Sequence, residues 1–507
     1  MPAITTSTSE LLSRFDSLRR TLAAYSHATG VLQYDGDTVA PRGSAALRGQ
    51  TLAVLSGVTY ELQTGSDTTE LLRELRSRSD ELDPITLRDV SEMLRRIERL
   101  SRIPADEYVA YNRLVNEAGA VWRDAKERSD FALFRPYLEK IFETNIRFNR
   151  YIAPDTPVYD TALDEYERGL TTEKCDAFFA ALRERIVPLM SRVSAYLAAS
   201  KPEPFTSRRF PVWKQRLLSG RLMDILRLDR DHCIIGETEH PFTSGFTRSD
   251  VRITTHYHEN SVLSSMFSVI HEGGHALYEL GIGEEYDGTG LAGGISMSIH
   301  ESQSRFYENI IGRSRAFAGL IVPVLREIFP EEAADVDAES FYRAVCRAEP
   351  SLIRIEADEL TYCLHIMVRY ELERGVMEGR FEVGDLPRLW NEKMGEYLGV
   401  TVPDDAHGVL QDSHWSGGGI GYFPSYALGS AYGAQMLEVM RKTVDVDAAV
   451  ASGDLSPVNG WLREHVWRHG CMYDPGDLLE RCCGAPFDPS CFTRYLERKY
   501  GDLCTNL

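Results

Sequence analysis

Apolar residues recur at intervals of three and four along most of this chain. Between Ser9 and Thr29 they mark one face of an amphipathic α-helix. The same period returns in further stretches: 44–64, 84–100, 105–127, 130–150, 172–199, 261–280, 300–315, 351–375, 384–397, 425–442 and 487–500. Because these helices use most of the chain, the predicted fold class is all-α.

One stretch, from Cys233 to Tyr257, departs from the helical period. Within it residues 251–255 (Val-Arg-Ile-Thr-Thr) alternate apolar with polar side chains and are rich in β-branched residues. That pattern is typical of a strand. We therefore expect a small β-hairpin in this region.

Helix-breaking residues group at 151–157, 201–211, 281–294 and 412–424. None of these groups resembles a flexible linker of low complexity, and the chain contains no repeats. No shift in composition marks a boundary either. We therefore expect one compact body over residues 1–507 rather than several independent domains.

Charge and composition narrow the classes of partner. The chain carries 56 Lys and Arg against 76 Asp and Glu, a formal net charge of −20. This balance argues against nucleic acid or an anionic membrane as a constitutive partner. No run of 18 apolar residues exists, so we expect no membrane span.

The nine cysteines form an odd set without a Cys-x-x-Cys pair. Four of them, Cys471, Cys482, Cys483 and Cys491, lie near the C-terminus, but their spacing matches no usual zinc finger or ribbon. Free thiols are therefore favoured over a structural metal site there. The first ten residues lack the basic and apolar segments of a signal peptide. Together these features predict a reducing, cytoplasmic location.

A short motif in the 261–280 helix carries the chemistry: His271-Glu272-Gly273-Gly274-His275. Residues four apart lie one above the other on a helix, so the two imidazoles can share one tetrahedral zinc ion. Glu272 points about 100° further round the helix, where it can reach a water on the metal without displacing it.

The alternative is that two surface histidines stand four apart by chance. The helix around them is apolar on most faces, which predicts that it is buried. Two buried imidazoles beside a buried carboxylate are costly without an ion to satisfy them. The two glycines weaken the helix by about 1 kcal/mol each relative to alanine, so we expect them to make room for an approaching backbone or substrate.

A third protein ligand is needed if the fourth metal position is to hold water. Glu301 is the candidate, because it lies on the next predicted helix after the glycine-rich turn 281–294. Two histidines and a glutamate are a ligand set that zinc peptidases use. The alternative for Glu301 is a solvated carboxylate on a helix surface.

These motifs, with four others in order along the chain, resemble the carboxypeptidase Taq family of metallocarboxypeptidases. The resemblance covers nearly the whole chain. The blocks that carry it are His240-Pro241-Phe242, Asp250-Val251-Arg252-Ile253-Thr254, His271–His275, His300-Glu301-Ser302-Gln303, Ile353-Arg354-Ile355-Glu356-Ala357-Asp358 and Gly408-Val409-Leu410-Gln411-Asp412-Ser413-His414-Trp415.

The resemblance implies a single peptidase domain, in which two helical halves flank a long central groove, similar to neurolysin and angiotensin-converting enzyme. It also implies a homodimer that removes C-terminal amino acids from peptides with a free C-terminus. The zinc ligands would be His271, His275 and Glu301, with Glu272 as the base and Co²⁺ or another divalent ion as a possible substitute. The residues matched around the substrate are His240, Arg252, Arg354 and His414. One departure is Tyr34, where tryptophan is expected.

The expected reaction follows from these groups. Zinc lowers the pKa of a water to about 7, and Glu272 takes its proton and delivers it to the leaving amine. His414 or Tyr422 is the candidate donor to the oxyanion. The alternatives are a packed core histidine and an ordinary groove-lining aromatic. Both residues belong to the segment 411–426, whose glycines 417–419 are candidates for a hinge.

A carboxypeptidase must also recognise a free carboxylate, which the planar fork of a guanidinium does well. Arg354 and Arg252 have this role in the resemblance, although an arginine on a helix is usually a surface charge. Asp358 stands four residues after Arg354, so we expect the two to pair on one helical face. We predict that Arg354→Ala raises the KM for peptides steeply and leaves the zinc content normal.

Two other functions stay open at this point. The metal motif alone does not say where a peptide is cut, so an endopeptidase or a dipeptidyl carboxypeptidase on the same scaffold is the alternative enzyme. A non-catalytic helical peptide-binding protein is the third possibility. The intact Glu272 argues against it, because a protein that only binds has no need of a base.

Overall fold

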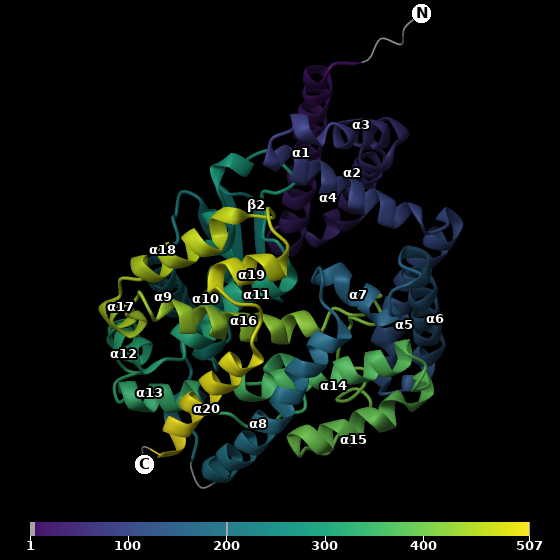
Figure 1. Ribbon diagram of the computed structural model, residues 1–507. Helices are drawn as coiled ribbons and strands as arrows, with labels where there is room; N and C mark the ends of the chain where they lie inside the picture. Colours follow the sequence, from purple (N-terminus) through teal and green to yellow (C-terminus); the bar gives the residue numbers. More distant parts are fainter. Residues whose placement is uncertain (1–5, 199–200, 506–507) are drawn as a thin grey trace, which may run out of the picture. The chain divides into compact units, whose positions relative to one another are not determined.

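The computed structural model describes residues 6–198 and 201–505. Part of the N-terminal stretch examined for a signal peptide, residues 1–5, lies outside that range. The described chain is dominated by helices with one three-stranded sheet, which confirms the all-α prediction (Figure 1). No helix in this range combines the length and apolar composition needed to cross a bilayer.

The chain divides into two compact units, each built from three separate segments. Unit 1 comprises Met1–Ser101, Arg209–Ile295 and Gly453–Asp474, and unit 2 comprises Arg102–Arg208, Ser296–Ser452 and Pro475–Leu507. The helices and strands of unit 1 are α1 (Thr8–Thr38), η1 (Arg42–Ser44), α2 (Ala45–Thr64), α3 (Ser66–Ser77), η2 (Ser79–Glu81), α4 (Pro84–Ser101), α9 (Val212–Leu226), β1 (Cys233–Glu237), β2 (Thr243–Thr247), β3 (Asp250–Thr255), α10 (Val262–Gly281), η4 (Glu284–Tyr286), α18 (Ser456–His465) and η8 (Trp467–His469).

In unit 1 the N-terminal helices pack on one another through the predicted apolar stripe. Helix α1 packs on α2 and α3, and α3 packs on α4 (Figure 1). Leu11 and Phe15 of α1 are fully buried with Leu72, Leu75 and Val90 of the neighbouring helices. The three-four spacing seen in the sequence therefore marks a buried face.

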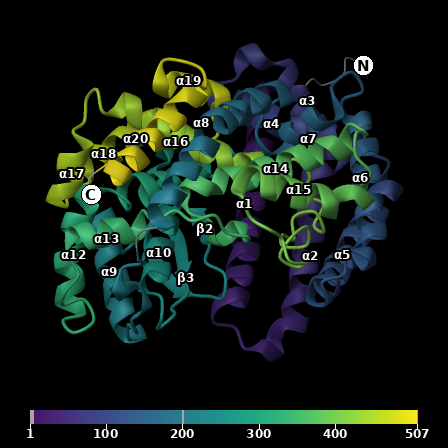
Figure 2. The ribbon, with the colours of Figure 1, turned by 90° about the horizontal axis from the view of Figure 1, so that it is seen from below.

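The sheet of unit 1 has the strand order β1-β3-β2. Strands β2 and β3 pair antiparallel, which confirms the predicted hairpin, and β1 adds a parallel strand that the sequence pattern did not predict. Helix α10, which carries the histidine motif, packs on β2, β3 and α9 (Figure 2). The hairpin therefore lies against the motif helix, as expected.

Unit 2 contains most of the helices. They are α5 (Ala105–Arg128), α6 (Phe131–Ile152), α7 (Val158–Tyr166), α8 (Thr172–Ala198), η3 (Pro204–Ser207), α11 (Met297–Arg305), the π-helix η5 (Phe306–Ile311), α12 (Arg315–Ile328), α13 (Ala338–Val345), η6 (Arg354–Glu356), α14 (Glu359–Met377), η7 (Val383–Asp385), α15 (Leu386–Leu398), α16 (Pro424–Met440), α17 (Val446–Ser452), α19 (Pro475–Cys483) and α20 (Pro489–Thr505).

Helix α14 is buried along most of its length, and it packs on α8, α15 and α16 (Figure 2). Helix α11, which carries Glu301, packs along α16. The predicted 351–375 helix is wrong at its start. Asp358 is the N-cap of α14, and its carboxylate accepts hydrogen bonds from the backbone N–H groups of Leu360 and Thr361. Such a cap begins a helix, so the residues before it lie outside α14.

Candidate metal and substrate residues

Helix α10 presents its two histidines one turn apart. The rings of His271 and His275 lie 5.0 Å apart between centroids and are nearly perpendicular, at 82°. Both side chains are partly exposed, so the apolar burial of α10 stops at this edge of the helix. The predicted pairing of the two imidazoles on one face is present in unit 1.

Glu272, between these histidines in the sequence, is 7% exposed. The Thr243 hydroxyl, from strand β2, donates a hydrogen bond of 2.7 Å to its carboxylate. Such a bond fixes the orientation of a carboxylate and favours its charged form. Thr243 was not predicted as a site residue, although it directly follows the His240-Pro241-Phe242 block.

The two glycines of the motif were expected to make room for a backbone or a substrate. At Gly273 that space is occupied by a neighbouring part of unit 1, not left open for a substrate. A Cβ there would lie 2.5 Å from the Leu226 Cδ1 of helix α9. Gly273 therefore allows α9 and α10 to pack closely, and that packing is a structural reason for a residue that weakens the helix.

Glu301 lies in unit 2 on helix α11, whose first turn is capped by the Ser296 hydroxyl. Its carboxylate accepts a hydrogen bond of 2.7 Å from Arg305 Nε and another of 3.2 Å from the Ser304 hydroxyl. The side chain is largely buried. A cation and a hydroxyl thus hold the carboxylate in one orientation, as a metal ligand requires.

Arg354 does not pair with Asp358, contrary to the prediction. Its Nε and Nη2 groups donate to Asp412 at 3.0 and 2.8 Å, and Nη1 donates to the Tyr362 hydroxyl at 3.0 Å. Arg369 donates to the other carboxylate oxygen of Asp412 at 2.7 Å. The Arg354–Asp358 pair required both residues on one helix, but Arg354 lies in the separate turn η6.

One carboxylate thus serves two buried guanidinium groups. Burial alone would raise the pKa of Asp412, but Arg369 and Arg354 hold it well below its usual value. The three bonds of Arg354 use three of its five N–H groups. The other two have no partner in the described part of the chain, so Arg354 keeps donors for an anion.

Tyr362 links this arginine to the surroundings of Glu301. The guanidinium of Arg305, which donates to Glu301, lies 4.4 Å from the Tyr362 ring centroid. The hydroxyl of the same ring accepts the bond from Arg354. Tyr362 therefore contacts both the predicted substrate arginine and the arginine that holds Glu301.

His414 and Tyr422, the two candidate oxyanion donors, lie together in unit 2 with ring centroids 5.3 Å apart. His414 Nε2 is 3.2 Å from the Tyr426 hydroxyl, and its Nδ1 has no hydrogen-bond partner among the described residues. Burial lowers the pKa of His414 to about 4, so the imidazole is neutral at pH 7. Burial also raises the pKa of Tyr422 above its usual value, which keeps the phenol protonated.

The glycine-rich segment that carries these donors is anchored to helix α14. The buried carboxylate of Glu373 accepts hydrogen bonds from the Trp415 indole at 2.7 Å and from the Gly421 N–H at 2.9 Å. Gly418 and Gly421 adopt φ values of +77° and +90°, which other residues rarely adopt. The predicted hinge glycines thus lie in a segment that is held on either side of Gly418.

His240 and Arg252 lie in unit 1. His240 is exposed in the connection between β1 and β2. Arg252, on β3, forms a two-pronged ion pair with Asp250 at 2.9 and 2.8 Å. Its guanidinium lies 5.1 Å from the ring centroid of Tyr34, so the tyrosine that replaces the expected tryptophan still provides an aromatic face.

The model of the Carboxypeptidase Taq (M32) metallopeptidase family matches residues 14–500. Carboxypeptidase 1 of Bacillus subtilis (strain 168) is 40% identical over 491 residues, which cover 96% of this chain and 97% of that protein. Thermostable carboxypeptidase 1 of Thermus thermophilus is 35% identical over 496 residues, 95% of this chain and 96% of that protein.

A solved structure agrees with these sequence matches. The M32 carboxypeptidase of Deinococcus radiodurans R1 has a TM-score of 0.94 and 35% identity, and the match covers 97% of this chain and 99% of that chain. The family expected from the six sequence blocks is confirmed. This chain belongs to the carboxypeptidase Taq family and is a metallocarboxypeptidase.

Proposed function

We propose that this metallocarboxypeptidase uses zinc held by His271, His275 and Glu301, with Glu272 as its general base. The observation that carries the proposal is the pair of imidazoles one turn apart on α10, beside a buried carboxylate. The two histidines and Glu301 form a set of side chains that could hold a metal ion. Cobalt or another divalent ion is the expected substitute.

The donor set fits zinc on chemical grounds. Two imidazole nitrogens and one carboxylate are ligands that zinc peptidases use, and they leave one position open. Arg305 and Ser304 already hold the Glu301 carboxylate, as outer partners of a metal ligand do. When bound, such an ion activates a water molecule and polarises the carbonyl of the scissile peptide bond.

Glu272 is the group that transfers the proton of the water molecule. Its carboxylate accepts the proton of the attacking water and delivers it to the nitrogen of the leaving amino acid, as a general base that becomes a general acid. The Thr243 hydroxyl holds this carboxylate in one orientation throughout. A carboxylate that is fixed in advance loses little conformational entropy when the reaction begins.

Arg354 is the proposed partner of the substrate C-terminal carboxylate. Asp412 and Tyr362 fix its guanidinium group, and two of its N–H groups stay available. We assign His240 and Arg252 to further substrate contacts. His414, which is neutral and has an unpartnered Nδ1, and the protonated Tyr422 are the proposed donors to the oxyanion.

Four further expectations, on domain organisation, assembly, location and partners, belong to the same proposal. The expected single peptidase domain would consist of two helical halves around a long groove, and its expected assembly is a homodimer. A cytoplasmic location is supported by the nine cysteines, all of which are free thiols. No partner is expected among nucleic acids or membranes.

The experiment is a release assay on peptides with a blocked N-terminus, with and without a chelator and with zinc or cobalt restored. We expect single amino acids from the C-terminus, lost with the chelator and regained with the metal. Dipeptides or internal fragments would show one of the alternative peptidases. Absence of metal-dependent cleavage would favour a protein that only binds peptides.

A further inference from the structure

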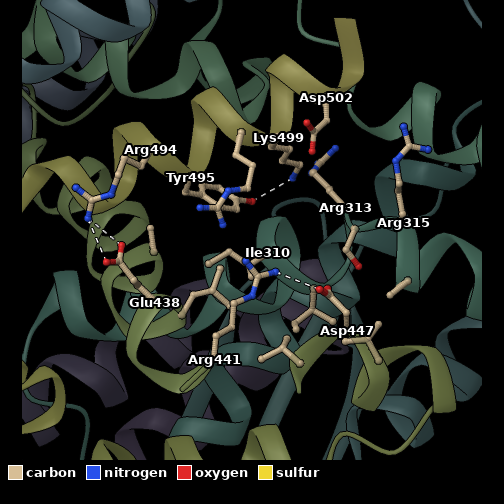
Figure 3. A pocket seen from close by; sticks show the side chains of 18 of the residues that line it. Ile310, Arg313, Arg315, Glu438, Arg441, Asp447, Arg494, Tyr495, Lys499 and Asp502 are labelled. Atoms are coloured by element: carbon tan, nitrogen blue, oxygen red, sulfur yellow. Dashed lines mark hydrogen bonds and ion pairs between the residues drawn. The ribbon is translucent and has the colours of Figure 1, made fainter. Parts of the chain in front are cut away.

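A cavity lies wholly within unit 2, and it shares no residue with the proposed metal and substrate sites. Its volume is about 600 Å³. Helices α12, α13, α16, α17 and α20 and the π-helix η5 contribute to its wall. Figure 3 shows the labelled side chains converging on it from these elements.

The wall of this cavity is cationic, although the protein as a whole is acidic. Three of its lining residues are acidic: Glu438, Asp447 and Asp502. Six are basic: Arg313, Arg315, Arg441, Arg494, Arg498 and Lys499. The local excess of positive charge contrasts with a net charge of −20 for the chain. Such a reversal in a concave surface concentrates anions.

Some of these basic side chains are held by hydrogen bonds to other residues of the protein. Arg313 donates to Asn309, to the Val345 carbonyl and to Glu308. Lys499 is similarly bound by Glu359, at 2.5 Å. Because these two side chains already donate hydrogen bonds within the protein, few of their N–H groups remain for a ligand.

Two other basic side chains of the cavity wall keep most of their N–H groups available. Arg498 is exposed and makes no hydrogen bond or ion pair with any residue that the structure describes. Arg441 has one contact, of 3.4 Å, with Asp447 (Figure 3). A guanidinium group with free N–H groups can bind two oxygens of one phosphate or carboxylate at once. Arg441 and Arg498 are therefore the anion-binding groups of the cavity.

Aliphatic side chains also line the cavity. Ile310, Ile311, Leu437, Val446 and Val450 all line the cavity and are themselves buried. A bare inorganic ion would leave this surface uncovered. Ligand pockets commonly combine an apolar lining with a few polar groups that orient the ligand.

We propose that this cavity binds a small organic anion. Its head group is an oxyanion, phosphate or carboxylate, which Arg441 and Arg498 bind. Its apolar body packs on the isoleucine, leucine and valine side chains. The site is separate from the proposed catalytic residues, so its test does not depend on the identity of the metal or on peptidase activity.

Isothermal titration calorimetry of the full chain tests this with hexyl phosphate, hexanoate, inorganic phosphate and hexanol. We expect hexyl phosphate or hexanoate to bind at least about tenfold more tightly than both inorganic phosphate and hexanol, because each buried methylene adds affinity. The stronger of the two identifies the head group. Equal binding of all four, or none, overturns the proposal.

Charge reversal locates the site. Arg441→Glu and Arg498→Glu should each weaken binding of the better probe about tenfold or more. The control is Arg388→Glu, an exposed, ion-paired arginine on α15 outside the cavity, with less than a twofold effect. An equal loss in the control means that binding is non-specific. An unchanged far-UV circular dichroism spectrum shows that the variants are folded.

Discussion

Glu272 combines burial, a hydrogen bond from Thr243 and a place between two histidines on α10. Glu272→Gln keeps the shape of the side chain and can still accept that hydrogen bond, but it cannot take a proton. We therefore predict that kcat/KM falls between about 100-fold and 10,000-fold while the metal content is unchanged.

Steady-state kinetics with metal analysis checks this prediction. The control is Glu279→Gln, on the same helix, which should keep kcat/KM within a few-fold of the unmodified protein. If Glu272→Gln retained full activity, the proton would have to go to another group and the assignment of the base would be wrong.

Asp358 alone was predicted to hold Arg354, but in the structure Asp412 has that role. Asp412 binds the guanidinium group, whereas Asp358 caps helix α14. We predict that Arg354→Lys raises the KM for peptides about tenfold or more, because lysine keeps the charge but loses the planar fork. Its kcat and metal content should change little.

Asp358→Ala provides the contrast. It should lower the free energy of unfolding by about 1 kcal/mol through loss of the cap and leave KM unchanged. Chemical denaturation and peptide kinetics measure both quantities. A raised KM in Asp358→Ala together with a normal KM in Arg354→Lys would reverse the assignment.

The sequence predicted the local part of the candidate site but not its long-range contacts. The local His271–His275 spacing was sufficient to predict two imidazoles on one helical face. The Arg354–Asp412 pair spans 58 positions, and no local period relates two such residues. Thr243 likewise reaches Glu272 only because β2 packs on α10.

At the scale of elements, the packing of α11 on α16 controls the position of Glu301. A Cβ on Gly429 of α16 would lie 2.7 Å from the Glu301 Cβ. We predict that Gly429→Ala displaces Glu301 and weakens metal binding about tenfold or more, since metal ligands tolerate little displacement. Competition with a chromogenic chelator measures this affinity.

Gly460→Ala on α18 is the matched control, because nothing lies within 4 Å of a Cβ at that helical position. Alanine there should stabilise the protein by roughly 0.5–1 kcal/mol and leave metal affinity unchanged. Unchanged metal affinity in Gly429→Ala would mean that α16 does not position Glu301.

Glu373 ties the 411–426 segment to helix α14, and burial raises its pKa from about 4.5 to about 7. A carboxyl group whose pKa is higher in the folded than in the unfolded protein stabilises the folded state. This contribution is fully present below about pH 4.5. That contribution is lost as the pH rises through about 7. The loss corresponds to up to about 3 kcal/mol.

Glu373→Gln has no such titration. We predict that the unmodified protein loses stability relative to Glu373→Gln as the pH rises from 5 to 8. Urea unfolding of both proteins at several pH values tests this. Parallel stability curves would show that the carboxyl group is ionised in the folded protein across the whole range.

Some helices and strands were predicted from the sequence more accurately than others. The motif helix was expected at 261–280 and begins at Val262, because its apolar period is long and regular. The helices that were not predicted are α3, α7, α9, α12, α13, α17, α18 and α19, and strand β1 was not predicted either. A short segment shows too few periods for helix and strand to be told apart, and tertiary packing then decides.

At the level of the whole molecule, nothing in the amino-acid sequence indicated that each compact unit is built from three separate segments. Contacts between distant segments leave no compositional boundary in the chain. The family blocks were informative at this scale because they are spread over most of the sequence. Unit 1 contains His271, His275 and the proposed base Glu272, and unit 2 contains Glu301 and Arg354.

The central proposal is that His271, His275 and Glu301 bind one zinc ion. The most direct test is the metal content of the purified protein and of His271→Ala, His275→Ala and Glu301→Ala, measured by mass spectrometry. We predict about one zinc per chain in the unmodified protein and in the control His232→Ala, and less than about a tenth of that in each ligand variant. Full zinc content in the three ligand variants would contradict the proposed site.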